Sequence, residues 1–192
     1  MDERLLAAVN GSDGGAVRVV LGGADRTAYP VYYGALPAAW TAVAVGAYDS
    51  DDALDLTMGM VGAYAAAVGL KRLVRRERPI SAHKWVVGRP QYPGGSDLDP
   101  YSWPSGHATL AAVVSTTLAL NHRDWRVVVP GVVWAGAVGT SRVWLGVHYP
   151  SDVVTGWLIG TGTAYLVHRL RNNGSSDSLG DGPLMRIVIP LG

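Results

Sequence analysis

Residues 141–152 read SRVWLGVHYPSD, in which Arg142 is followed by His148 and then, four positions further on, by Asp152. At this spacing the carboxylate of Asp152 can accept the proton on Nδ1 of His148 and leave Nε2 as a nucleophile. A histidine with an aspartate four residues away is also typical of a simple surface pair. Other segments of the chain are therefore needed to decide between the two interpretations.

Two such segments carry residues that suit a phosphate group. The segment KRLVRRERP begins at Lys71 and contains Arg78, and the segment PSGH covers residues 104–107. A transferring phosphoryl group spreads negative charge over three oxygens, which arginine forks and a lysine ammonium can hold. Gly106 lets the backbone approach an anion closely. The apolar run that begins at Ala108 predicts a helix whose N-terminus would bind that anion.

The two histidines are expected to have different roles. His148 has Asp152 as an orienting partner, whereas His107 lies at the predicted anion-binding turn without such a neighbour in sequence. We therefore expect His107 to protonate the leaving oxygen and then to activate water. Taken singly, the run from Lys71 to Arg78 could be the basic end of a membrane helix, and the PSGH segment could be a helix cap. The combination favours a phosphate site.

The three segments K-x6-R-P, P-S-G-H and S-R-x5-H-x3-D together resemble the signature of the type 2 phosphatidic acid phosphatase (PAP2) superfamily, in its branch of membrane lipid-phosphate phosphatases. This resemblance implies that His148 forms a phosphohistidine, that Asp152 orients it and that His107 is the acid. It implies a helical core like that of acid phosphatases and vanadium haloperoxidases. It also implies that five residues bind the phosphoryl oxygens: Lys71, Arg78, Ser105, Gly106 and Arg142.

Composition predicts an all-α bundle that is integral to a membrane. The chain has 192 residues, a net charge of +1, 48% hydrophobic and 16% charged residues, so we expect one domain that does not bind nucleic acid by charge. Several apolar runs have only about 15 residues, which would equally suit buried helices of a soluble bundle, and the mean hydropathy of +0.16 is modest. The runs predict about five transmembrane helices, over residues 27–48, 53–70, 108–121, 127–141 and 153–167.

The order of these runs predicts that the three motifs converge. Lys71 at the end of the second run and His107 at the start of the third lie on one membrane face. The third and fourth runs cross and return, which brings Arg142 and His148 to the same face. We expect this face to lie outside the cytoplasm, as the resemblance also favours, because the opposite face receives four arginines that suit a cytoplasmic side: Arg123, Arg126, Arg169 and Arg171.

The remaining segments are expected to border a single membrane-embedded domain over residues 1–171. Residues 1–26 are interpreted as a lead-in, either a short helix in the membrane interface or an irregular segment. Residues 172–192 are expected to form a flexible tail. Residues 80–103 form a long polar loop, whose length indicates a functional segment. Three of its side chains either bind a headgroup or anchor the loop in the interface: His83, Lys84 and Arg89.

We therefore expect a phosphatase that hydrolyses a lipid phosphate or diphosphate, with polyprenyl diphosphates and phosphatidate-type lipids as the leading substrates. No metal or other cofactor is expected, because the three cations are accompanied by no cluster of carboxylates with metal-ligand spacing. One alternative is an enzyme like a vanadate-dependent haloperoxidase, in which His148 would bind vanadium. Another is a non-catalytic lipid-phosphate binding or transport protein, which would not need both histidines and Asp152. The oligomeric state is not predicted.

Overall fold

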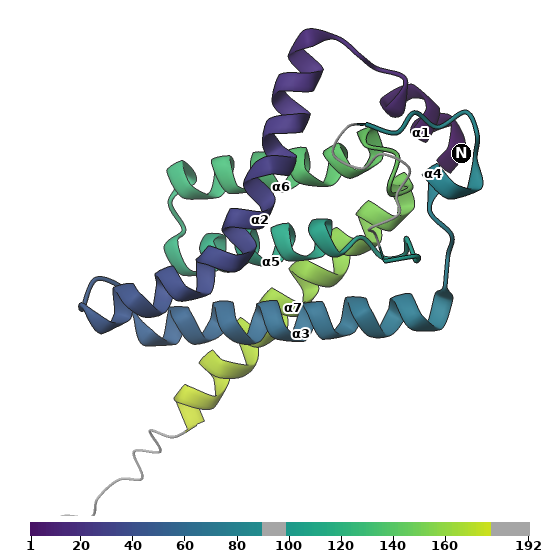
Figure 1. Cartoon of the computed structure of the whole chain (residues 1–192). Helices are drawn as coiled ribbons and strands as arrows, with labels where there is room; N and C mark the ends of the chain where they lie inside the picture. Colours follow the sequence, from purple (N-terminus) through teal and green to yellow (C-terminus); the bar gives the residue numbers. More distant parts are fainter. Residues whose placement is uncertain (90–98, 178–192) are drawn as a thin grey trace, which may run out of the picture.

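The computed structural model describes residues 1–89 and 99–177, and in these residues the chain is helical with an isolated β-bridge between Glu77 and Tyr101. The prediction of an all-α fold is confirmed (Figure 1). The helices follow one another as α1 (Asp2–Asn10), α2 (Gly15–Ala44), α3 (Ser50–Val74), α4 (Pro79–Ala82), α5 (Gly106–His122), α6 (Trp125–Trp144) and α7 (Pro150–Asp177).

All five long predicted helices are present, and four of them include the whole apolar run that indicated them and extend beyond it. These four are α3, α5, α6 and α7. Some of the added residues are first turns, which capping side chains stabilise: Asp49 accepts a hydrogen bond from the Asp51 amide, and Asp124 accepts one from the Arg126 amide. The other added residues extend the C-terminal ends, as in α3, α6 and α7. Because α7 continues to Asp177, the predicted tail begins within a helix, and its residues 178–192 lie outside the described part of the chain.

The helix predicted over residues 27–48 is present as α2, but its predicted bounds are wrong. α2 begins at Gly15 and ends at Ala44, so it includes charged residues that had appeared to precede it. One of them, Asp25, is buried in an ion pair with Arg142 and therefore does not mark a helix boundary. Residues 1–26 consist of α1 and the first part of α2, and their placement in a membrane interface stays a prediction.

α5 lies at the centre of the bundle and packs against α3, α6 and α7. Small residues allow α7 to approach it closely. A Cβ added at Gly156 would lie 2.7 Å from the Ser105 carbonyl oxygen, and one at Gly160 would lie still closer to the Thr109 carbonyl oxygen. The backbones of α5 and α7 are therefore in contact, as is typical of helices that associate through small residues.

The helix ends that carry the motifs lie at one end of this bundle. α3 ends, α5 begins, α6 ends and α7 begins on the side where α1 and α4 also lie (Figure 1). The predicted convergence of the three motifs is therefore seen in the fold. The opposite end carries the α2–α3 and α5–α6 turns.

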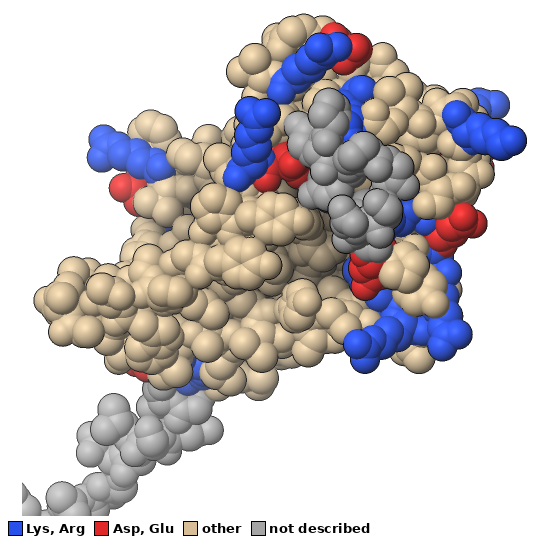
Figure 2. Space-filling model, viewed as in Figure 1, with Lys and Arg blue, Asp and Glu red and all other residues tan. Residues whose placement is uncertain are grey.

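The surface between the two ends is largely uncharged in the view of Figure 2, and lysines, arginines and acids gather toward the ends. Large apolar side chains are exposed there, among them Val61, Val133 and Leu158, with 60%, 64% and 69% of their surface accessible. In the described residues, α3 and α6 are long and apolar enough to cross a membrane. Five transmembrane helices stay a prediction.

Candidate active site

Hydrogen bonds join the three motifs to one another. The Ser105 amide donates to the Asp152 carbonyl oxygen over 3.0 Å, which links the start of α5 to the start of α7. Nη1 of Arg78 donates to the Val147 carbonyl oxygen over 2.8 Å, and the Ile80 amide donates to the Gly146 carbonyl oxygen over 3.0 Å. Segments that are far apart in sequence thus form one site.

His148 lies buried in the turn between α6 and α7, which Gly146 closes with a φ of +74°. Its Nε2 is 3.1 Å from Nη1 of Arg78. Because a guanidinium can only donate, Nε2 is the acceptor and the ring proton is on Nδ1. Nδ1 faces Oδ2 of Asp152 at 3.6 Å, which is longer than a hydrogen bond. The Asp152 carboxylate thus faces the nitrogen that it is predicted to orient. Catalytic hydrogen bonds are often this long before substrate binds.

The same surroundings keep His148 uncharged. Burial lowers its pKa well below 6.5, and the positive charges of Arg78, Lys71 and Arg142 lower the pKa further. A neutral imidazole retains the lone pair that a nucleophile needs.

Asp152 is also held by hydrogen bonds from other groups than its histidine. Its Oδ2 accepts a hydrogen bond from the Tyr149 amide over 2.8 Å, and its Oδ1 accepts one from Nη1 of Arg76 over 2.7 Å. Arg76 also donates to Asp2 of α1 over 2.7 Å, and its guanidinium lies 3.7 Å above the Tyr149 ring. Sequence reasoning missed this role, because Arg76 is one of several cations in the run before Arg78.

The three predicted phosphate-binding cations are all buried, with 8%, 5% and 1% of the surface of Lys71, Arg78 and Arg142 accessible. Nζ of Lys71 donates to the Tyr101 carbonyl oxygen over 2.7 Å, and Nε of Arg78 donates to the Asp99 carbonyl oxygen over 2.6 Å. Arg142 forms an ion pair with Asp25. Buried charges are costly unless opposite charges accompany them, so a cluster of this kind favours an anionic ligand.

His107 lies in the first turn of α5, beside this cluster. The turn is capped by Ser105, whose hydroxyl accepts a hydrogen bond from the Ala108 amide over 3.4 Å. Nε2 of His107 is buried and makes no hydrogen bond to any described residue. Buried polar atoms are normally hydrogen-bonded, and the oxygen of a bound substrate would supply the partner. The predicted anion-binding residues Ser105 and Gly106 begin the same turn.

The loop residues predicted to bind a headgroup are in different surroundings. Nε2 of His83 lies 3.1 Å from the hydroxyl of Tyr149, the residue that follows His148 in sequence. Lys84 is exposed. Arg89 is buried, donates to the Asn10 carbonyl oxygen over 2.7 Å and stacks on Trp144 at 4.2 Å. Arg89 therefore ties the loop to α1. A role of these residues in headgroup binding stays a prediction, and residues 90–98 of the loop lie outside the described residues.

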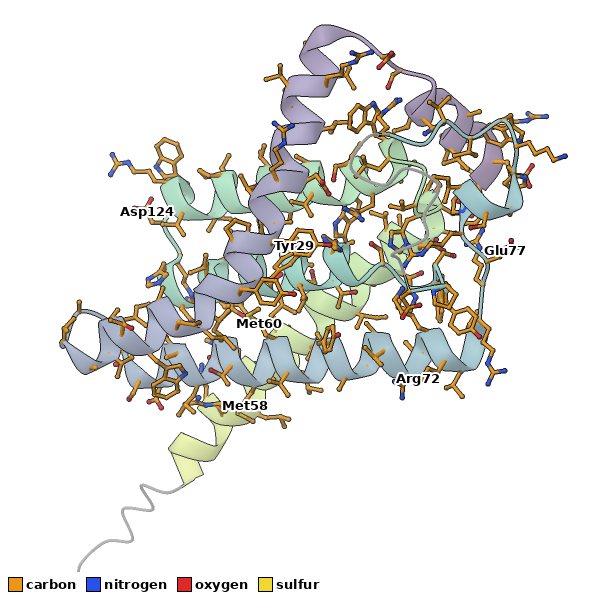
Figure 3. All side chains as sticks on the ribbon, in the orientation of Figure 1. Tyr29, Met58, Met60, Arg72, Glu77 and Asp124 are labelled. Atoms are coloured by element: carbon orange, nitrogen blue, oxygen red, sulfur yellow. The ribbon has the colours of Figure 1, made fainter. Side chains whose placement is uncertain are left out.

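An apolar groove of about 500 Å³ leads to His107 from the side of the bundle. α2 and α3 form its two walls, and Figure 3 labels Tyr29 on the first and Met60 on the second. The groove ends at the turn that is predicted to bind phosphate. Its lining consists of Tyr29, Tyr32, Tyr33, Met60, Val61, Tyr64, Gly106, His107 and Leu110.

Comparison with protein families agrees with this arrangement. The sequence model of the PAP2 superfamily matches residues 52–175. The chain belongs to the PAP2 superfamily. The matched range contains all three motifs of the site, whereas α1 and α2 precede it.

Curated relatives in this superfamily are phosphatases. An undecaprenyl-diphosphatase of Sulfolobus acidocaldarius is 39% identical over 38% of this chain and 35% of its own length. A decaprenylphosphoryl-5-phosphoribose phosphatase of Mycolicibacterium smegmatis is 37% identical over 65% of this chain and 66% of its own length. The PAP2 chain thus spans about one third to two thirds of the relatives that it matches.

Solved structures share the fold. Aquifex aeolicus LpxE superposes with a TM-score of 0.72 at 19% identity and covers 88% of this chain and 94% of its own. A transmembrane PAP2-type phosphatidylglycerolphosphate phosphatase of Bacillus subtilis superposes with a TM-score of 0.68 at 24% identity, over 90% of this chain and 85% of its own. At these identities the likeness concerns the fold, and it supports the prediction of a membrane helical bundle.

Proposed function

We propose that this PAP2 protein is a membrane phosphatase that hydrolyses a lipid phosphate or diphosphate, with polyprenyl-linked phosphates as the leading substrates. The observation that carries the proposal is the buried cluster of cations and histidines at the inner end of an apolar groove. A charged headgroup fits the cluster, and a hydrocarbon chain fits the groove. The relatives named for polyprenyl substrates support the choice of lipid.

In the first step, Nε2 of His148 attacks phosphorus and the bond from phosphorus to the lipid oxygen breaks. His107 donates a proton to that oxygen, so the lipid leaves as an alcohol, or as a monophosphate when the substrate is a diphosphate. Lys71, Arg78 and Arg142 hold the equatorial oxygens and stabilise the charge that builds up on them. The product of this step is a phosphohistidine.

In the second step, His107 takes a proton from water as the water oxygen attacks the phosphohistidine. The bond from phosphorus to Nε2 of His148 breaks, and inorganic phosphate leaves. Asp152 keeps the imidazole of His148 in one orientation and tautomer throughout, as the aspartate does in a hydrolase triad. Arg76 and the Tyr149 amide hold the Asp152 carboxylate in place.

Phosphate release by the purified, detergent-solubilised protein tests this proposal. The panel comprises a polyprenyl diphosphate, a polyprenyl monophosphate, a prenylphosphoryl sugar phosphate, phosphatidate and phosphatidylglycerol phosphate. We expect turnover of a prenyl-linked substrate that survives EDTA and is lost in His148→Gln. Lipid binding without turnover would support a binding protein instead, and vanadate-dependent oxidation of bromide would support the peroxidase alternative.

A further inference from the structure

One face of α2 lies against the active site, although this helix precedes the residues that match the family. Asp25, Tyr29 and Tyr32 are spaced by four and three residues, so they share a face of the helix. Each of the three contacts Arg142 or His107. This helix therefore reaches two groups of the phosphate site.

Asp25 contacts the first of these groups. Its Oδ1 accepts a hydrogen bond from Nη1 of Arg142, and the two side chains form an ion pair within the protein. Their side chains are 6% and 1% accessible, so water does not screen the pair. A guanidinium is planar, and anchoring one of its N–H groups on a carboxylate restricts the plane in which its other donors lie.

The two tyrosines contact the second group. The Tyr32 hydroxyl donates to the His107 carbonyl oxygen over 2.7 Å. The Tyr29 and Tyr32 rings meet the His107 imidazole edge to face, with centroids 5.0 Å and 5.5 Å away. α2 therefore contacts the first turn of α5 at the residue that is expected to move protons.

We propose that this face of α2 is a positioning element of the phosphate site, in which Asp25 fixes the orientation of Arg142 and Tyr32 fixes the turn that carries His107. The proposal rests on the proposed function. Asp25 is negative, so it opposes the binding of any anion nearby. Its contribution is therefore to the alignment of donors with the transferring phosphoryl group, which affects the transition state more than the ground state.

Two inhibitors distinguish an effect on the transition state from an effect on the ground state. Orthophosphate resembles the ground-state product, whereas orthovanadate accepts a fifth ligand and resembles the transferring group. In Asp25→Asn we expect kcat to fall about tenfold to a hundredfold, and vanadate inhibition to weaken by a similar factor. Phosphate inhibition should stay the same or tighten. A merely smaller fraction of folded enzyme would lower the apparent kcat and leave both inhibition constants unchanged.

Asp55→Asn is the matched control. Asp55 is also a buried aspartate on a long helix, but it pairs with His168 and Arg171 at the opposite end of the bundle. We expect this variant to retain the wild-type ratio of the two inhibition constants. If Asp25→Asn also retains the wild-type ratio, the positioning role is wrong.

A double variant tests whether Asp25 acts through Arg142. Asp25→Asn should lower kcat in the wild-type background and have little further effect in Arg142→Gln. An equal fold-change in both backgrounds would overturn the proposal. If Asp25→Asn does not fold, Asp25→Glu and Tyr32→Phe replace it, and wild-type inhibition ratios in both would overturn the proposal.

Failure of the proposed function can be distinguished from failure of the positioning role. If the wild-type protein releases phosphate from no lipid in the panel, the proposed function fails. The positioning role is then tested by the rise in melting temperature that vanadate or orthophosphate causes. Asp25→Asn should weaken the stabilisation by vanadate and not the stabilisation by orthophosphate. Equal effects on both would overturn it.

Discussion

A nucleophilic histidine needs a lone pair on one ring nitrogen and a partner for the proton on the other, and His148 has a neighbour on each side of its ring. Arg78 donates toward Nε2 at 3.1 Å, and Asp152 faces Nδ1 at 3.6 Å. The arginine thus occupies the position next to Nε2 where a phosphate oxygen would be held. The imidazole and its electrophile would be brought together by one side chain.

The covalent intermediate is the first prediction at this scale. During turnover, acid-labile and base-stable phosphate should be found on His148, because Nε2 attacks phosphorus directly. His107→Ala should slow both formation and breakdown of the adduct, since one residue serves both steps. The measurement uses isotope-labelled substrate, a rapid quench in base and mapping by mass spectrometry. Active enzyme that carries no label on His148 would contradict the mechanism.

The pH dependence is the second prediction. Burial and the neighbouring cations lower the pKa of His148 well below 6.5, so kcat/KM should show no acidic limb near pH 6.5 and should fall only at lower pH. An acidic limb centred at or above pH 6.5 would contradict the assignment.

The same lowered pKa has a consequence for stability. The unfolded chain takes up a proton on this residue near pH 6.5 and the folded chain does not, so stability present above that pH should decrease as the pH falls below it. The melting temperature of the wild type minus that of His148→Gln should therefore be larger at neutral pH than in acid. An unchanged difference would indicate that His148 titrates normally in the folded protein.

Residue spacing predicted the members of the site, and it could not predict their outer partners. Lys71, His107 and His148 are recognisable because chemistry limits which side chains can do their work. Asp25 and Arg76 contact the predicted site residues Arg142 and Asp152, and no local pattern distinguishes them from a helix-boundary charge or a basic cluster. Only tertiary structure shows that Asp25 meets Arg142 across 117 positions of sequence.

At the scale of helices, the contact between α5 and α7 depends on glycines that face α5. Gly160→Ala should lower the melting temperature, because the new Cβ would lie too close to the Thr109 carbonyl oxygen; overpacking of this kind costs about 1–3 kcal/mol. Gly162→Ala is the matched control on the same helix. A Cβ there meets nothing within 4 Å, so it should be neutral or stabilise by up to about 1 kcal/mol. Equal melting temperatures of the two variants would contradict this packing.

Apolar runs predicted α3, α5, α6 and α7 well, because a long uncharged run in a chain of this composition is rarely anything but a buried or membrane helix. The same criterion misplaced the start of α2. Charged residues were taken as its limit, yet Arg18 is paired with Asp13 at the surface and Asp25 is paired inside the bundle. Charges inside α2 therefore do not mark its start, whether they face water, as Arg18 does, or are buried, as Asp25 is.

At the scale of the whole molecule, helix order alone brings the motifs to one end of the bundle, and the fold in Figure 1 has that arrangement. The apolar groove lies at the side of the bundle, between α2 and α3. A lipid lying in the bilayer could thus reach His107 while its headgroup stays near the membrane surface. The opposite end is held by ion pairs between α3 and α7, in which Asp55 contacts His168 and Arg171.

The side of the membrane that the site faces is the last prediction, since it decides which leaflet supplies the substrate. We expect the site outside the cytoplasm, because Arg123, Arg126 and Arg169 lie toward the other end, and excess arginine marks the cytoplasmic side. The chain has no cysteine, so single cysteines can be read without background. Ser81, in α4 at the site end, and Ser50, at the start of α3, are both exposed. In intact cells an impermeant maleimide should label Ser81→Cys. It should label Ser50→Cys only after permeabilisation. The reverse pattern would leave the chemistry of His148 unchanged but would place its substrates in the cytoplasmic leaflet, which would exclude a role in recycling carrier lipids released at the outer face.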